Sequence, residues 1–504
     1  MTTILTRRQI GTLLGAAAGS AALVGGAPPA LAAPPGAEGP TGPLVHAAGE
    51  LLRRMRVPSG PRTADGPVWA PLATGFAGVP DASLPLGTVG GLGGRLLIAT
   101  SVEEFIAAVG APEPTIVLLR GTLTLPFGTM VDVASDTSIL GVGRGAELVG
   151  GGLRLPSVRN VVIRNLTIRD SFVPGDWDGK SEDNDNDGIR VDTSDHVWID
   201  HCEFVRLGDG QVDIRKDSTA VTVSWSIFRD HNKTLGVGWT DNAVTTLTVH
   251  HTRFSNTHQR NGSIDQVAAG HMYDNWHAGH SSYGMSARGA GQVLVENSVF
   301  QHVRNPLIQS DPDSGIHQIG CQFEGTWGRH DDTGPTIDPS DHYAHTADST
   351  DQVIPLLTQH GGPHGRHEPA PRRLRVAQDG SGDVASVHAA IGAAWRSPHP
   401  VEIIVAPGTY REALTIWPGL EGLVIRGESG DPADVVLTYD KRTTDWASLT
   451  VLCSEVTLRA LTVENTHPAE PGSGEAAAIR HIDDTLVLED VEVRGDLVLD
   501  DPRV

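Results

Sequence analysis

The residues with the clearest chemical potential are the aspartates of the acidic stretch DNDNDGIRVD, which runs from Asp183 to Asp192. Its first six residues match the start of an EF-hand calcium loop, in which oxygen ligands alternate and a glycine permits a sharp turn. A twelve-residue loop of that kind closes on a glutamate, but Ser194 occupies that position and Arg190 lies inside the stretch. An EF-hand is therefore excluded, and another element must position these carboxylates.

That element is predicted by a repeat. Short apolar runs end on aromatic residues at steps of 24, 26, 22, 24 and 23 residues, at Phe204, Phe228, Phe254, Trp276, Phe300 and Phe323. Apolar residues mostly alternate within each run, which indicates strands. Strands that recur at this period and cannot bury a face alone are expected to stack as coils. We therefore predict an all-β fold, a right-handed single-stranded parallel β-helix.

Stacked coils would bring residues one repeat apart side by side, about 4.8 Å from each other. Asp187, Asp209, Lys233 and Arg260 follow one another at steps of 22, 24 and 27 residues. The spacing predicts one surface strip with two cations, Lys233 and Arg260, at one end. The carboxylates at its other end are Asp185, Asp187, Asp209 and Asp213.

Four carboxylates this close repel each other. At about 4 Å and an effective dielectric of about 20, each like-charge pair costs about 4 kcal/mol, so a counter-cation or raised pKa values are needed. A cluster of oxygen ligands with flexible geometry favours Ca²⁺ over Mg²⁺. The alternative is a solvated acidic turn that binds nothing, and Asp183 is expected to be only a solvated neighbour of the site.

Six ordered motifs carry a family resemblance: VWIDHCEF, DGQVDI, TVSWSIF, HNKTLGVG, HHTRFSNTHQR and GHMYDNW. Together they resemble the core of the pectate lyase superfamily of polysaccharide lyases, over residues 70–360. The resemblance implies Ca²⁺ ligands at Asp187, Asp209 and Asp213, with Asp185 joining when substrate is bound. It also implies a substrate-binding lysine at Lys233 and a catalytic base at Arg260.

The implied activity is the cleavage of polygalacturonate, which is demethylated pectin, by β-elimination to 4,5-unsaturated products. An arginine is an unusual base, so a clamp on substrate carboxylate is the alternative role for Arg260. The family usually has a proline two residues and a second arginine five residues after the base, where this chain has Gly262 and Asp265. A non-catalytic polyuronate-binding β-helix and a pectin lyase-like enzyme therefore remain alternatives.

The two ends of the chain differ from this middle. Residues 1–32 resemble a bacterial export signal with paired arginines, Arg7 and Arg8, which predicts secretion by the twin-arginine or the general secretory route. We expect a lyase-like β-helix at 33–362, a linker rich in His, Pro and Gly at 363–371, and a second, shorter β-helix-like domain at 372–504.

That last domain is similar to the first part of pectin methylesterases, in DGSGD, APGTYRE and VENT. The later motifs that carry the esterase reaction are absent from this sequence. The resemblance therefore implies a truncated, non-catalytic module that contacts polysaccharide or caps the solenoid, or else a degenerate remnant.

Composition limits the possible partners. The formal net charge of −23, from 38 basic and 61 acidic residues, argues against a general nucleic-acid binder. No run after the export signal is apolar enough for a membrane span. Cys202, Cys321 and Cys453 are far apart in sequence and are expected to be buried free thiols. We expect a monomer whose partner is pectin or polygalacturonate.

Overall fold

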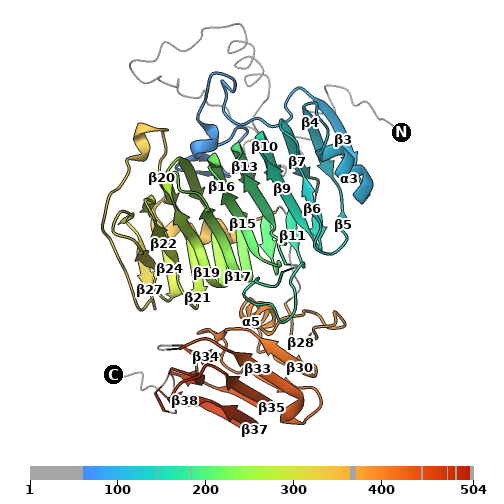
Figure 1. Ribbon diagram of the computed structural model, residues 1–504, viewed down its shortest axis with the longest axis vertical. Coiled ribbons are helices and arrows are strands. Elements are labelled where there is room, and N and C mark those ends of the chain that lie inside the picture. The colour runs from blue at the N-terminus through green and yellow to red at the C-terminus, as the bar shows by residue number, and fades with distance from the viewer. Residues whose placement is uncertain are drawn as a thin grey trace.

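The computed structural model describes residues 61–499, apart from 144, 183, 364–369, 444–445, 471, 474 and 483–484. The predicted export signal, Asp183 and most of the predicted linker lie outside the described residues. Figure 1 shows a long array of parallel strands and a second, smaller array that packs against its side through helix α5. The boundaries proposed for the domains stay predictions.

The first array is a parallel β-helix. Its ten-stranded sheet consists of β3 (Arg95–Ala99), β4 (Thr115–Leu119), β7 (Thr137–Gly141), β10 (Arg159–Arg164), β13 (Asp195–Asp200), β16 (Thr219–Ser224), β18 (Thr245–His250), β20 (Val267–Tyr273), β23 (Gln292–Glu296) and β26 (Gly315–Ile319).

A fifteen-stranded sheet supplies the remaining walls, because the long strands β17 (Ile227–Gly238) and β19 (Arg253–Asp265) join two runs of short strands. One run is β5 (Thr122–Thr124), β8 (Glu147–Val149), β11 (Thr167–Arg169), β14 (Glu203–Val205), β21 (Trp276–His280), β24 (Val299–Val303) and β27 (Gln322–Glu324). The other is β6 (Met130–Asp132), β9 (Gly152–Pro156), β12 (Ile189–Asp192), β15 (Gly210–Arg215), β22 (Met285–Arg288) and β25 (Leu307–Gln309). Neighbouring strands pair in parallel, which confirms the predicted solenoid.

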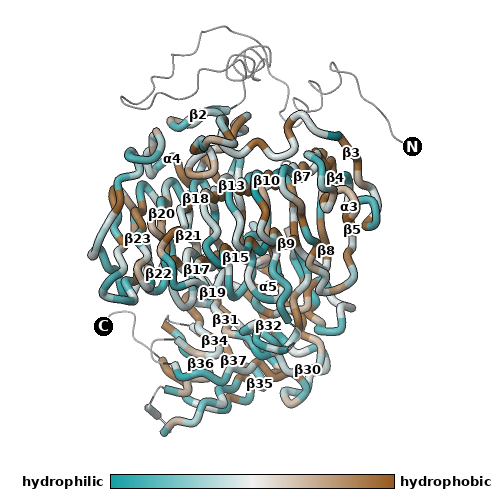
Figure 2. The backbone as a smooth tube through the Cα atoms, turned by 45° about the horizontal axis from the view of Figure 1, so that its top comes forward, coloured by the Kyte–Doolittle hydropathy of each residue, from teal (hydrophilic) through white to brown (hydrophobic). Residues whose placement is uncertain are grey.

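The core follows the alternation seen in the sequence. Val197 and Val221, for example, are fully buried and in register on β13 and β16. Figure 2 shows hydrophobic and hydrophilic positions alternating along the coils. Inside the solenoid, six rings stack with centroids 4.5–5.0 Å apart, namely Phe204, Phe228, Phe254, His277, Phe300 and Phe323.

One aromatic residue of the repeat spacing, Trp276, does not join this stack. The register pairs Phe254 with His277, so His277 fills the place that the sequence pattern gave to Trp276. Trp276 instead lies partly buried beneath Arg253, whose guanidinium carbon is 4.3 Å from the ring centroid. A single residue's difference in turn length is enough to exchange two adjacent side chains between the inner and outer faces of a strand.

Short elements cover the ends and the sides of the first array. Helix α3 (Val102–Val109) follows Ser101, whose hydroxyl caps it by accepting the Glu104 N–H, and it buries Phe105 in the first coil. The hairpin of β1 (Arg62–Thr63) and β2 (Gly66–Pro67) forms the only antiparallel strand pair of the described residues. The other covering elements are η1 (Gly75–Gly78), η2 (Pro339–Asp341) and α4 (Thr350–His360).

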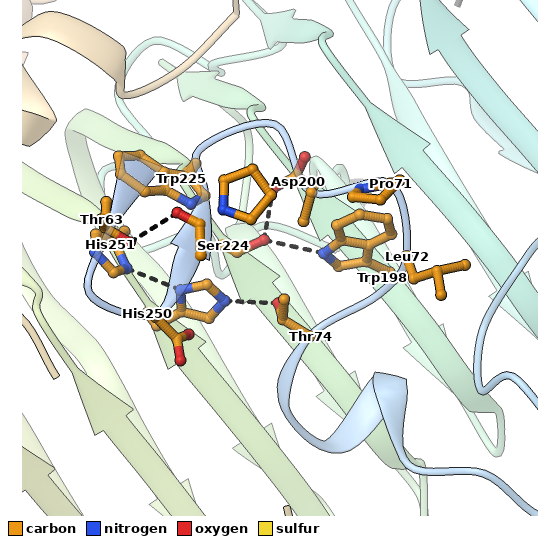
Figure 3. A pocket seen from close by; sticks show the side chains of 14 residues that line it. Thr63, Pro71, Leu72, Thr74, Trp198, Asp200, Ser224, Trp225, His250 and His251 are labelled. Carbon is orange, nitrogen blue, oxygen red and sulfur yellow. Dashed lines mark hydrogen bonds between the residues drawn. The ribbon is translucent and has the colours of Figure 1, made fainter. Parts of the chain in front are cut away.

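The N-terminal segment crosses the ends of β13, β16 and β18 and encloses a small pocket there (Figure 3). Its polar groups bind one another: Trp198 Nε1 donates to Ser224 Oγ at 3.0 Å, and Ser224 Oγ donates to Asp200 at 2.6 Å. His250 contacts Thr74 at 2.7 Å. The pocket belongs to the ten-stranded sheet, away from the strands that carry the predicted strip, and its paired groups fasten the N-terminal segment to the solenoid.

The second array is a shorter parallel solenoid with its own hydrophobic core, as predicted. One sheet holds β28 (Arg373–Val376), β29 (Glu402–Val405), β30 (Gly408–Arg411), β32 (Val424–Gly427), β33 (Val435–Tyr439), β35 (Val456–Asn465) and β37 (Leu486–Arg494). The other holds β31 (Leu414–Ile416), β34 (Leu449–Val451), β36 (Ala477–His481) and β38 (Asp496–Leu499). Its helices are α5 (Val387–Trp395) and η3 (Pro432–Asp434). We call this array the C-terminal unit.

None of the helices in the described part of the chain has the length and apolar character needed to cross a bilayer. Cys202, Cys321 and Cys453 are free thiols, and Cys321 is only partly buried, which corrects the expectation that all three are buried.

Candidate active site

The six predicted site residues lie on, or shortly before, neighbouring strands of the fifteen-stranded sheet. Asp185 and Asp187 belong to the segment that leads from β11 to β12, which we call the acidic segment. The other four lie on the strands that follow, immediately before or within β15, in β17 and in β19, and they are Asp209, Asp213, Lys233 and Arg260. The solenoid therefore brings together residues that are up to 75 positions apart in sequence.

The residues of the predicted strip are not paired directly with one another across neighbouring strands. Gly210, rather than Asp209, is paired with Lys233, and Lys233 is paired with Gln259, rather than with Arg260. Turns of unequal length cause these one-residue offsets, which sequence spacing does not reveal. The side chains bridge one of them, since the Lys233 ammonium forms an ion pair with the Asp209 carboxylate. Arg260 has a φ of 61°, so the strand turns locally at this residue.

Two carboxylates face each other across a glycine. Asp187 and Asp213 are both buried, and the Gly210 N–H donates to Asp187 Oδ1 at 2.7 Å. A Cβ at Gly210 would lie 2.5 Å from Asp213 Oδ1 and 3.1 Å from Asp187 Oδ1. Asp213 Oδ1 is buried without a hydrogen-bond partner. Because Gly210 has no side chain, the Asp187 and Asp213 carboxylates face each other directly across it.

The protonation of this pair reflects its surroundings. Burial, together with the charge of Asp209, raises the pKa of Asp187 to about 6, although Arg190 opposes the shift. Burial and then the charge of Asp187 raise the pKa of Asp213 well above its ordinary value. Carboxylates in such a setting are stabilised either by protons or by a cation.

Arg190, which served above only to exclude an EF-hand, contacts two of the aspartates. Its Nε donates to Asp187 Oδ2 at 2.7 Å, and its Nη1 donates to Asp185 Oδ2 at 2.6 Å. Asp185 is largely exposed. Among the described residues, no three of the four aspartates have carboxylate oxygens that all lie within 4.8 Å of one another. The structure thus brings Asp187 and Asp213 together across Gly210 and places Asp209 near enough for its charge to raise the pKa of both, whereas Arg190 binds Asp185.

This donor set fits a calcium ion. Asp187 and Asp213, from two successive coils, face each other across Gly210, and one of the Asp213 oxygens is unpartnered. Only oxygen ligands are present, as hard cations require.

The cationic end holds an aromatic ring that the sequence analysis missed. Trp239 is 46% exposed, and the guanidinium carbons of Arg260 and Arg215 lie 5.4 and 5.5 Å from its ring centroid. An exposed tryptophan directly after the motif HNKTLGVG was the available signal. Rings that are exposed in this way bind the apolar faces of other flat groups.

Asp265, which stands where the family usually has its second arginine, has a cationic neighbour. Asp265 is paired in register with Arg288 on the next coil, and the Arg288 guanidinium opposes the rise that burial causes in the pKa of Asp265. Arg288 also donates to Ser263 Oγ at 3.0 Å. A cation is therefore present beside the position where the family usually has its second arginine, but it comes from the neighbouring strand.

Comparisons with known proteins identify the family of this chain. Residues 64–315 match the family described as pectate lyase. A pectate trisaccharide-lyase of Thermotoga sp. is 32% identical over 326 residues, which cover 57% of this chain and 88% of that protein. Pectate lyase A of Emericella nidulans is 35% identical over 250 residues, covering 47% and 72% of the two chains.

Among solved structures, a pectate lyase of Bacillus sp. in complex with trigalacturonate is 27% identical, with a TM-score of 0.48, and the match covers 57% of this chain and 98% of that one. The family match spans half of the chain, from the first hairpin to β26, and includes every residue of the predicted strip. This chain belongs to the pectate lyase family of polysaccharide lyases.

Proposed function

We propose that this protein is a secreted, Ca²⁺-dependent pectate lyase that cleaves polygalacturonate by β-elimination and leaves 4,5-unsaturated oligogalacturonides. The observation that carries the proposal is the pair of buried carboxylates, Asp187 and Asp213, that face each other across Gly210, with Lys233 and Arg260 on the next two strands. Relatives named pectate lyase and pectate trisaccharide-lyase support the choice of pectate as substrate.

Asp187, Asp209 and Asp213 are the proposed calcium ligands, and Asp185 joins them when substrate is present. Bound calcium supplies a Lewis acid that withdraws negative charge from a uronate carboxylate. The chain prepares this site by burying two of the carboxylates and by keeping Gly210 free of a side chain.

Lys233 is the proposed anchor for a substrate carboxylate. Its side chain is 4% exposed and pairs with Asp209, so its ammonium is held at the edge of the acidic group. A substrate carboxylate that binds Lys233 would compete with Asp209 for the ammonium and release that aspartate to the cation. The binding of substrate and of calcium would then support each other.

Arg260 is the proposed base that takes the proton from C5 of the uronate. The electrons of the broken C5–H bond form the C4–C5 double bond as the C4–O bond breaks, and the leaving oxygen takes up a proton, so no water is consumed. Arg260 lies over Trp239, whose exposed ring offers a face to the sugar. Arginine is normally protonated, so a clamp on the substrate carboxylate is its alternative role.

Asp265 favours a second candidate, a β-helix that binds polyuronate without turnover, because an acid here repels an anionic polymer. A pectin lyase-like activity on methylated polymer is a third candidate. The acidic group favours the demethylated substrate, since only free uronates share a cation with aspartates.

The deciding experiment incubates the protein with polygalacturonate at alkaline pH and follows the ultraviolet absorbance of the unsaturated product, with calcium and with chelator. We expect a calcium-dependent rise that is lost in Arg260→Ala and kept in Arg95→Ala, a control that removes an exposed arginine paired with Glu113. Calcium-dependent binding of the polymer without any rise in absorbance would support the second candidate, a polyuronate-binding β-helix without turnover. A rise on methylated pectin alone would identify a pectin lyase.

Export and the role of the C-terminal unit complete the proposal. Residues 1–32 would direct the chain out of the cell by the twin-arginine or the general secretory route. Residues 372–504 would form a pectinesterase-like module that contacts polysaccharide or caps the solenoid.

A further inference from the structure

The C-terminal unit is fixed to the strands that carry the site. Arg396 Nη1 and Nη2 donate to the two oxygens of Asp230 at 3.0 and 2.7 Å, and Asp230 is fully buried on β17. Asn256 of β19 donates to the His388 carbonyl at 3.0 Å and accepts a hydrogen bond from Trp417 Nε1 at 2.9 Å. A buried ion pair with this many directional bonds defines one docked position.

From this position, the C-terminal unit also binds the acidic segment. Trp177 of that segment is 2% exposed and packs in a cluster with Tyr439. The Asp178 carboxylate accepts a hydrogen bond from Arg411 Nη2 at 2.8 Å and lies 3.7 Å from Lys441 Nζ. Burial tends to raise the pKa of Asp178, but Arg411 and Lys441 outweigh it and hold that pKa below its usual range.

The anchored residues connect directly to the site. The Trp177 carbonyl accepts from Asn232 Nδ2 at 2.6 Å, and Asn232 precedes Lys233. Gly179, with a φ of 57°, comes so close to the site that a Cβ there would lie 2.6 Å from Asp209 Oδ1. The backbone that follows Asp178 therefore rests against a proposed calcium ligand.

A second connection runs toward the other aspartates. Asp176 Oδ2 accepts from Asn184 Nδ2 at 2.7 Å, and the same amide donates to the Gly208 carbonyl at 2.9 Å. Asn184 is buried and directly precedes Asp185. These two hydrogen bonds hold the residue before Asp185, so the turn after Trp177 helps to fix the position of Asp185.

From these contacts we infer that the C-terminal unit braces the acidic segment, with Arg411 and Lys441 as positioning residues for calcium binding. The inference rests on the proposed function, because it assigns a role at the proposed calcium site. Without the brace, Trp177 and Asp178 would lose their main partners, and the segment would have to be ordered by the ion itself. That ordering would weaken calcium binding while leaving the arrangement of Lys233 and Arg260 intact.

The test compares Arg411→Gln and Asp178→Asn, which remove the ion pair from either side, with Arg375→Gln. Arg375 forms an equally good pair with Glu428, at 2.7 and 2.8 Å, within the C-terminal unit and apart from the acidic segment. Calcium binding is measured by calorimetry on chelator-treated protein, and amide hydrogen exchange is measured for residues 176–182. Outer contacts of a metal site are worth about 10- to 100-fold in affinity, so we expect a rise of about tenfold in the calcium Kd.

We expect faster exchange at residues 176–182 in both brace variants, about wild-type kcat at saturating calcium, and partial recovery in Arg411→Lys. Arg375→Gln should match the wild type. Exchange and calcium affinity that stay at the control's level in both brace variants would overturn the inference, as would a wild-type protein that binds no calcium. A wild-type protein that binds calcium but lacks lyase activity would refute the proposed function alone, since exchange and calcium affinity would still report on the brace.

Discussion

Asp187 and Asp213 are buried on either side of Gly210, and no side chain separates them. In chelator their repulsion is relieved only by protonation or by Arg190 and Arg260. Asp213→Asn removes one charge and lets the new amide donate to Asp187. We therefore expect this variant to be more stable than the wild type in chelator at pH 7, by about 2 kcal/mol, measured by thermal unfolding.

When calcium is added, the wild type should become more stable than Asp213→Asn, because the variant lacks one of the calcium ligands. Asp132→Asn is the matched control, since it removes an exposed carboxylate that is paired with Arg154 and should change the melting temperature little. A lower melting temperature for Asp213→Asn in chelator would contradict the view that Asp187 and Asp213 repel each other when no calcium is bound.

Arg288 is the residue on which the substrate prediction depends. Asp265 stands where the family usually has its second arginine, and Arg288 on the next coil would replace that positive charge. Arg288→Ala should then raise KM for polygalacturonate about tenfold, which corresponds to about 1.4 kcal/mol, with little change in kcat. Asp265→Ala should lower KM, since it removes a negative charge beside an anionic polymer. Arg329→Ala, which removes an exposed arginine paired with Asp331, is the control. An unchanged KM in Arg288→Ala would assign that arginine to structure alone.

At the scale of elements, the strands and the coil period were predictable because alternation and regular spacing are local properties of the sequence. Asp185, Asp187, Asp209, Asp213, Lys233 and Arg260 were placed in one region for the same reason. Their exact register was not predictable, because turn lengths differ and Gly210 takes the place beside Lys233. Arg190, Trp239 and Arg288 were missed because their roles depend on which side chains meet across coils.

The stack of rings inside the first solenoid allows the contribution of a single coil to stability to be measured. His277 lies between Phe254 and Phe300 at 4.9 and 4.5 Å, and burial holds its pKa well below the ordinary value, so the ring is neutral. We expect His277→Ala to cost about 3 kcal/mol of unfolding free energy, because it leaves a cavity in the stack. His277→Phe should cost about 1 kcal/mol or less, since it keeps a ring in the stack and removes the unpartnered Nε2. Chemical denaturation measures both, and equal losses would show that the ring itself contributes little.

At the scale of the whole molecule, two parallel solenoids lie side by side and share an interface at β17 and β19. The change of character after residue 362 predicted a second domain, but nothing in the sequence showed that its helix α5 would pack on the strands that carry Lys233 and Arg260. The contacts of Asp230 with Arg396 and of Asn256 with His388 join residues more than 130 positions apart, which no local pattern reveals.

That interface predicts how the molecule unfolds. Burial opposes the ionisation of Asp230, but Arg396 and Arg229 outweigh it and hold its pKa well below the ordinary value of 3.8. A carboxyl whose pKa is lowered on folding stabilises the fold above its unfolded pKa, and this contribution is lost as the pH falls toward the folded value. We expect a single calorimetric transition for the wild type at pH 7.

Arg396→Met should cost about 3 kcal/mol at that pH and separate the melting of the C-terminal unit from that of the first solenoid, because it leaves a buried carboxylate with one partner fewer. The difference between variant and wild type should shrink below pH 4, where Asp230 in the unfolded chain is protonated. Arg459→Met, which removes an exposed pair with Glu489 in the C-terminal unit, should keep the single transition. If Arg396→Met also melts in one step at the wild-type temperature, the two solenoids are coupled by their apolar contacts, and the ion pair serves only to orient them.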